Sequence, residues 1–92
     1  MAQTIDEISV NYEEDGKLIV EELDKEILSK GAWTTILFKF RQWDNKLDDY
    51  GPEKFTIRRY RKLKGEYKQQ TKFNISSVDQ AQKIVAALQK WI

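Results

Sequence analysis

Residues 33–43 form the stretch WTTILFKFRQW, in which apolar and polar side chains alternate. Successive side chains of a β-strand point to opposite faces of a sheet, so this alternation predicts a long strand. Its more apolar face carries the even-numbered positions Thr34, Ile36, Phe38, Phe40 and Gln42. Its other face mixes cations with aromatic rings at the odd-numbered positions Trp33, Thr35, Leu37, Lys39, Arg41 and Trp43.

Three further segments show the same period of two and are predicted as strands: residues 17–29, 55–63 and 67–75. The tripeptide Lys64-Gly65-Glu66 joins the last two as a hairpin turn, because glycine adopts positive φ without steric cost. A polar loop with the only proline of the chain, residues 44–54, separates the second strand from the third.

A helix is predicted after the last strand. Ser77 stands three residues before Gln80 in a capping-box pattern, and Asp79 lies where the helix dipole favours negative charge. The apolar stripe of this helix recurs at three- and four-residue spacing and comprises Ala81, Ile84, Val85, Leu88 and Trp91. We expect the stripe to bury against apolar strand residues, namely Ile36, Phe38, Phe40, Phe55, Ile57, Phe73 and Ile75.

The predicted fold class is therefore α+β, a four-stranded antiparallel curved sheet followed by one C-terminal helix (β-β-β-β-α). Residues 17–92 make a single domain of this kind. Residues 1–16 form an acidic segment that is either a flexible tail or an extra strand, because Ile8, Val10 and Tyr12 alternate before a turn at Asp15-Gly16.

Composition restricts the chemistry. The 92 residues include neither Cys nor His, which excludes disulfides, thiolate nucleophiles, the usual zinc sites and imidazole acid–base catalysis. Asp44, Asp48 and Asp49 fit no calcium-loop spacing, and no phosphate-binding or nucleophile motif is present. We expect a non-enzymatic protein with no cofactor and no metal.

The chain also has no apolar run long enough to span a membrane, and its first residues lack the pattern of a signal peptide. We therefore expect a cytoplasmic location. A single domain of this size buries too little surface to be very stable alone, and dimerisation would relieve that.

Charge is distributed unevenly. The chain has a net charge of +1, but residues 54–72 hold eight Lys or Arg against one acid, Glu66, a local charge of +7. Three aromatic residues are interleaved with these cations: Phe55, Tyr60 and Tyr67. Cations that follow a phosphate backbone and rings on which bases stack are the two requirements for holding single-stranded nucleic acid. The acidic residues 1–31, with net charge −6, would keep duplex DNA or wrong partners off the basic face, or simply be a solvated face.

Three motifs carry a family resemblance: Thr56-Ile57-Arg58-Arg59-Tyr60, Gly65-Glu66-Tyr67-Lys68 and Lys72-Phe73-Asn74-Ile75-Ser76. With the strand order, they make residues 24–92 resemble the transcriptional positive-cofactor-four family of single-stranded DNA-binding domains, including its bacterial members. The resemblance implies a homodimer joined through the helices, phosphate contacts at Arg58, Lys68 and Lys72, and base stacking on Trp33 and Trp43. Pur-alpha-like domains are a neighbouring alternative that keeps this function and changes the dimer geometry.

We therefore expect binding of single-stranded DNA, or RNA, on the sheet face that the helix leaves bare, in transcription or DNA maintenance. The expected phosphate contacts are Lys39, Arg41, Arg58, Arg59, Arg61, Lys62, Lys68 and Lys72. The expected stacking residues are Trp33, Trp43 and Tyr60, and the expected core and dimer residues of the helix are Ile84, Val85, Leu88 and Trp91. The alternative is a protein–protein interaction module whose basic face docks an acidic partner.

Overall fold

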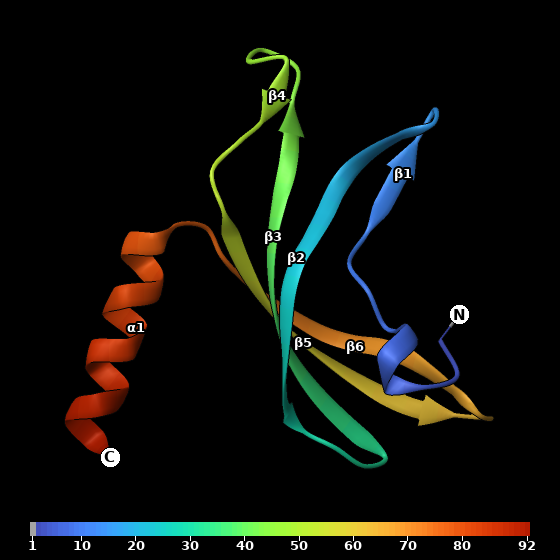
Figure 1. Cartoon of the computed structure of the whole chain (residues 1–92). Helices are drawn as coiled ribbons and strands as arrows, with labels where there is room; N and C mark the ends of the chain where they lie inside the picture. The colour runs from blue at the N-terminus through green and yellow to red at the C-terminus, as the bar shows by residue number, and fades with distance from the viewer. Residues whose placement is uncertain (1) are drawn as a thin grey trace.

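The computed structural model describes residues 2–92, which form a curled antiparallel sheet with one helix standing beside it (Figure 1). In chain order the elements are a 3-10 turn η1 (Ile5–Glu7), β1 (Tyr12–Glu14), β2 (Lys17–Ser29), β3 (Trp33–Asp44), β4 (Asp49–Tyr50), β5 (Lys54–Leu63), β6 (Glu66–Ile75) and α1 (Val78–Trp91). The predicted α+β class, with an antiparallel sheet and a C-terminal helix, is confirmed.

The number of strands differs from the prediction. The sheet runs β1-β2-β3-β5-β6, and the two-residue β4 pairs with β3 beside this path. The register shifts between β1 and β2, twice between β2 and β3, and again between β5 and β6. Each such bulge bends a strand and increases its twist, so the sheet curls into a half-barrel.

The hairpin turns follow local chemistry. Lys64 and Gly65 both have positive φ, 52° and 80°, and connect β5 to β6 as expected. Asp15 and Gly16 have φ of 52° and 78° and connect β1 to β2. Two consecutive positive φ values are the pattern whose twist matches that of antiparallel strands, and only glycine and a few polar residues tolerate it cheaply.

The register between β3 and β5 decides which residues share a face. Ile36 lies opposite Arg58, and Leu37 lies opposite Ile57. The even-numbered apolar residues of β3 therefore share a face with Arg58 rather than with Ile57. The prediction that Ile36, Phe38 and Phe40 join Phe55 and Ile57 under the helix is wrong.

The face of Ile36 and Arg58 is covered by residues 2–10, which we call the strap. Its side chains Ile8 and Val10 are 3% and 6% exposed and pack with the residues of the sheet that complete the core: Ile36, Phe38, Phe40 and Tyr60. Figure 1 shows the strap crossing the open side of the curled sheet. We call this side of the sheet the strap face and the opposite side the helix face.

The strap is fixed by polar contacts as well as by burial. Lys25 Nζ donates to the carbonyl oxygens of Ile5, Asp6 and Ile8 at 3.2, 3.2 and 2.7 Å. Tyr67 N donates to Ala2 O at 2.8 Å. The ammonium of Lys25 thus holds strap carbonyls against β2, and it shares Ile5 O with Ile8 N, which donates to the same oxygen at 3.1 Å.

Helix α1 begins as predicted. The Ser77 side chain accepts a hydrogen bond from Gln80 N at 3.1 Å, and the Gln80 side chain accepts one from Ser76 N at 3.0 Å. The predicted burial of the helix is wrong, however, because none of its residues is buried. Register is the reason: the large apolar residues of β3 point to the other face, where the strap covers them.

Candidate nucleic-acid interface

The β5–β6 hairpin carries cations that form no ion pair with a carboxylate of residues 2–92. Three ion pairs occur among residues 2–92: Lys39–Glu53 at 3.3 Å, Arg41–Glu21 at 2.6 Å and Lys83–Asp79 at 3.3 Å. None of them involves a cation between positions 54 and 72. Within this segment, the cations without an ion pair to residues 2–92 are Lys54, Arg58, Arg59, Arg61, Lys62, Lys64, Lys68 and Lys72.

On the strap face, Arg58 lies opposite Lys72, and Lys62 lies opposite Tyr67. Arg58 Nη1 donates to Gln69 Oε1 at 3.1 Å, whereas its Nε is buried with no hydrogen-bond partner in the described part of the chain. Lys62 Nζ lies 5.5 Å from the centre of the Tyr67 ring. This edge of the strap face therefore combines exposed cations with amide side chains and one partly exposed ring.

Tyr60 belongs to the same face but is not accessible. Its side chain is 6% exposed and packs under the strap with Ile8 and Phe38. Burial raises the pKa of the Tyr60 phenol above its ordinary value, and the positive charge of Arg58 opposes this rise. The prediction that Tyr60 presents a free stacking surface does not fit this conformation, because strap side chains cover it.

On the helix face, Trp33 lies beside two arginines. The guanidinium carbons of Arg59 and Arg61 lie 4.6 and 5.4 Å from the centre of the Trp33 ring, and Lys68 pairs with Arg61 across the hairpin. Trp33 is 41% exposed. The result is a second basic and aromatic surface, on the opposite side of the hairpin from Arg58.

A bulge explains why Lys68 and Lys72 separate. Strict alternation would put them on the same side, as expected from the sequence. The register shift beside Gln70 places Lys68 opposite Arg61 and Lys72 opposite Arg58. An extra residue in one strand reverses the faces of all residues beyond it, so these two lysines lie on opposite sides of the sheet.

Trp43 lies at the other end of β3 and is already engaged. Lys17 Nζ lies 3.7 Å from the centre of its ring, and Tyr50 packs against it edge-on with ring centres 5.2 Å apart. Arg41 lies over the Tyr50 ring at 4.0 Å while pairing with Glu21. These contacts fold the loop before β5 onto the sheet and leave Trp43 less open to a ligand than Trp33.

The predicted site is therefore not one surface. Arg58, Lys62 and Lys72 lie on the strap face with Tyr60. The remaining candidates lie on the helix face: Arg59, Arg61 and Lys68 beside Trp33, and Lys39 and Arg41 toward Trp43. Tyr67 is not among the stacking residues expected from the sequence, and its position opposite Lys62 identifies it as part of the basic edge.

Comparison of the chain with models of protein families, with curated proteins and with solved structures finds no match. The resemblance to positive-cofactor-four domains thus stays a prediction. Across residues 2–92, the structure includes no helix of the length and hydrophobicity needed to cross a lipid bilayer.

Proposed function

We propose that this protein binds single-stranded nucleic acid without catalysing a reaction, and that the β5–β6 hairpin is its main contact. One observation carries the proposal: eight cations lie on this hairpin, and no carboxylate of residues 2–92 pairs with any of them. Repulsion among them costs folding free energy, and a polyanionic ligand removes that cost by contributing the missing negative charge.

Aromatic rings favour unpaired strands over duplexes. Trp33 on β3 and Tyr67 on the hairpin both keep open surface, and each has a cation of the hairpin within 5.5 Å of its ring centre. A base stacks on such a ring only when its own face is free, which is the case in a single strand. Stacking also tolerates any base, so we expect little sequence preference from these contacts.

A dimer through α1 is the second part of the proposal. The exposed area is 6747 Å², whereas a monomer of 10.9 kDa exposes about 5,600 Å². The radius of gyration is 14.7 Å, against about 12 Å for a compact domain of this length. The chain thus exposes more surface than a compact monomer of its size, and contact with a second copy of the chain would bury part of that surface.

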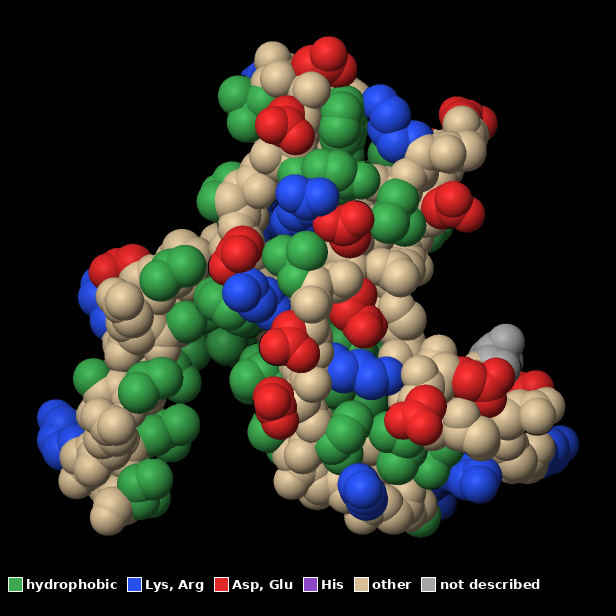
Figure 2. Space-filling model, viewed as in Figure 1, with side chains coloured by type: hydrophobic (Ala, Val, Ile, Leu, Met, Phe, Trp, Pro, Cys, Tyr) green, Lys and Arg blue, Asp and Glu red, His purple; other side chains and the backbone are tan. Residues whose placement is uncertain are grey.

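The exposed apolar surface that a second copy would cover lies between α1 and the helix face. Val85 and Leu88 are 53% and 49% exposed on the helix, and Phe73 is 54% exposed on β6. Together with Phe55, helix residues line a hollow of about 370 Å³, and Figure 2 shows hydrophobic side chains on the flank of the helix toward the sheet. Two copies related by a twofold axis would each place a helix against these residues of the other.

The function is tested by titrating fluorescent oligo-dT and a duplex of equal length with the protein at two salt concentrations. If about five phosphates are neutralised, the logarithm of the binding constant falls with that of salt at a slope near −3.5 for the single strand. We expect weaker binding to the duplex, and weaker binding of oligo-dT by Arg58→Ala and Lys72→Ala.

Lys39→Ala is the matched control, because it removes one positive charge that Glu53 already pairs. Its effect on oligo-dT affinity should be smaller than that of Lys72→Ala. If neither nucleic acid binds at low salt, the proposed nucleic-acid binding is wrong. The alternative, a basic surface that docks an acidic protein, would then be favoured. Equal affinity for single strand and duplex would eliminate the role of the rings.

A further inference from the structure

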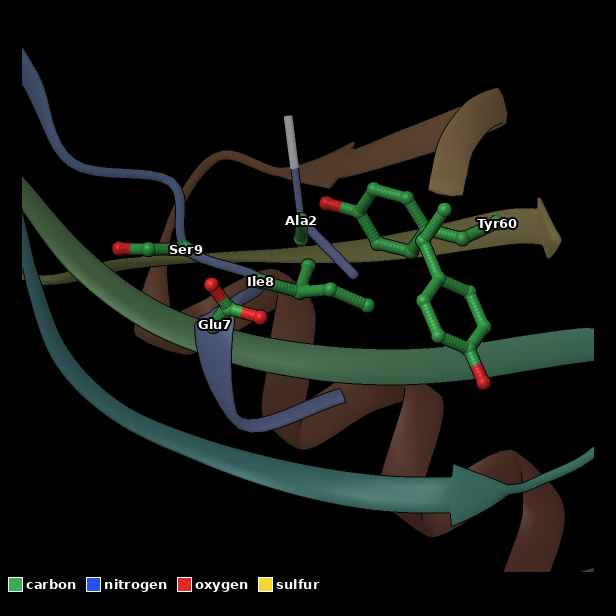
Figure 3. Close-up of a pocket in the computed structure, with 6 residues that line it drawn as sticks. Ala2, Glu7, Ile8, Ser9 and Tyr60 are labelled. Atoms are coloured by element: carbon green, nitrogen blue, oxygen red, sulfur yellow. The ribbon is translucent and has the colours of Figure 1, made fainter. Parts of the chain in front are cut away.

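A hollow of about 430 Å³ lies where the strap meets the β5–β6 hairpin. Figure 3 shows its lining residues, with Glu7 and Ser9 of the strap on one side, Tyr60 of β5 on the other, and Ala2 and Ile8 between them. Tyr67 of β6 completes its lining. The hollow is therefore shared between the strap and the part of the sheet that carries the unpaired cations.

The walls of the hollow suit a flat heteroaromatic ring. Tyr67 contributes a partly exposed ring, Tyr60 contributes the small part of its ring that the strap leaves uncovered, and Ile8 and Ala2 contribute apolar surface. Tyr60 and Ile8 are held in place by the core, at 6% and 3% exposure, so their positions do not depend on a ligand. A preformed, mostly apolar site with a few polar groups is the usual character of a small-ligand pocket, and its volume exceeds that of one nucleobase.

Glu7 gives this hollow an acceptor. Its Oε1 accepts hydrogen bonds from Gln3 N at 3.3 Å, Thr4 N at 3.0 Å and Thr4 Oγ1 at 3.0 Å, which fix the carboxylate at the start of η1. All the hydrogen bonds that Glu7 accepts from residues 2–92 go to this oxygen. Oε2 of the same carboxylate keeps its capacity to accept, and a carboxylate only accepts at neutral pH.

The hollow also lies beside phosphate-binding groups. Lys62 Nζ lies 5.5 Å from the centre of the Tyr67 ring, and Arg58 stands on the same face two residues before Tyr60. Neither cation has an ion pair among the described residues. A strand whose phosphates contact these two side chains would bring one of its bases to the opening.

We propose that this hollow is a base subsite that prefers guanine. The inference rests on the proposed single-strand binding and adds a base preference to it. Guanine presents two adjacent donors, N1–H and the N2 amine, on its Watson–Crick edge. Adenine and cytosine place an acceptor next to their amine, and thymine flanks its single N–H with two carbonyls, so each of them repels the Glu7 carboxylate at one or more positions.

The test compares oligo-dT with the same oligonucleotide carrying one central guanine, or one inosine, which lacks the N2 amine. We expect the guanine oligonucleotide to bind about tenfold more tightly than oligo-dT, the value of one good base contact, and the inosine oligonucleotide to lie between them. This comparison uses the unaltered protein, so it does not depend on whether a variant folds.

Glu7→Gln then isolates the carboxylate, because glutamine keeps the oxygen that accepts from Thr4. It should raise affinity for all oligonucleotides slightly, through loss of negative charge, while abolishing the preference for guanine. Glu13→Gln, on exposed β1, makes the same charge change outside the hollow and should leave the preference intact.

The outcomes separate the two proposals. Binding of oligo-dT with no preference for guanine would overturn the base subsite and leave single-strand binding in place. A preference that survives in Glu7→Gln would equally overturn it. Absence of binding to all three oligonucleotides would overturn the proposed function, and the subsite with it.

Discussion

Arg58 and Lys72 lie directly opposite each other on β5 and β6, two cations without a carboxylate partner among residues 2–92. Like charges at directly opposed positions of an antiparallel pair destabilise a sheet. The hairpin is thus less stable than its hydrogen bonding alone would make it. A bound phosphate between the two side chains would convert this repulsion into attraction.

Stability and binding should therefore change in opposite directions at Lys72. We expect Lys72→Gln to raise the free energy of unfolding by about 0.2–1 kcal/mol, because it removes the repulsion with Arg58. The same change should reduce the salt slope for oligo-dT by about 0.7, since one phosphate contact is lost. Urea denaturation and fluorescence anisotropy measure the two quantities.

Lys46→Gln serves as the control, because it removes a positive charge from the exposed loop after β3. It should change neither quantity measurably. A stability loss in Lys72→Gln would show that repulsion with Arg58 is not significant in the folded protein.

The exposed helix predicts a concentration-dependent dimer. We expect the protein to have twice the monomer mass by light scattering, and Leu88→Glu to return it to a monomer. Burying a charged side chain in an apolar contact without a partner is strongly unfavourable. Leu88 lies on the exposed apolar stripe, so the sheet, which does not depend on it, should keep its far-ultraviolet circular dichroism.

Lys90→Gln changes the net charge by the same amount at an exposed polar position of α1 and should remain dimeric. A wild-type protein that is monomeric at all concentrations would contradict the proposed dimer through α1. Its exposed area would then need another explanation.

Tyr60 should make the fold sensitive to alkali. Burial raises the pKa of its phenol in the folded state above the ordinary value of 10.0, so the unfolded state loses the proton first as pH rises. The stabilisation from the buried neutral phenol is complete below pH 10 and is lost as pH rises through the folded-state pKa. Urea denaturation should therefore show stability decreasing above about pH 10.

Tyr60→Phe should weaken this decrease, because it removes the ionisable group from the core. Tyr12→Phe, at a position 55% exposed, should not. The lysines titrate in the same pH range, but both variants contain all of them. Their effect on stability therefore cancels when the two variants are compared. Equal alkaline sensitivity of both variants would contradict the burial of Tyr60.

Lys25 should contribute to stability through the strap. Lys25→Met keeps the length of the side chain but removes its three hydrogen bonds to strap carbonyls. We expect a loss of about 1.5–3 kcal/mol in the free energy of unfolding, the range for hydrogen bonds to charged groups. The exposed Lys30, in the turn after β2, provides the control variant Lys30→Met, which should cost much less.

The local elements of this protein follow from its sequence. Period-two patterning predicts the strands, consecutive residues with positive φ form the hairpin turns, and Ser77 with Gln80 starts the helix. Each of these features depends on neighbours within a few positions, where side-chain direction and backbone sterics act. The concentration of cations in residues 54–72 is likewise a property of the sequence.

Only the tertiary structure decides which residues share a surface. Leu37 rather than Ile36 faces Ile57, and Lys68 and Lys72 diverge, because strand register and a single bulge determine the face of every residue beyond them. The packing of Ile8 against Ile36 also depends on the tertiary structure, because these residues are far apart in the sequence. A short apolar segment packs on whichever apolar face of the sheet no other element covers. Periodicity along one strand carries no information about the strand beside it, and for this reason the candidate site divides between two faces.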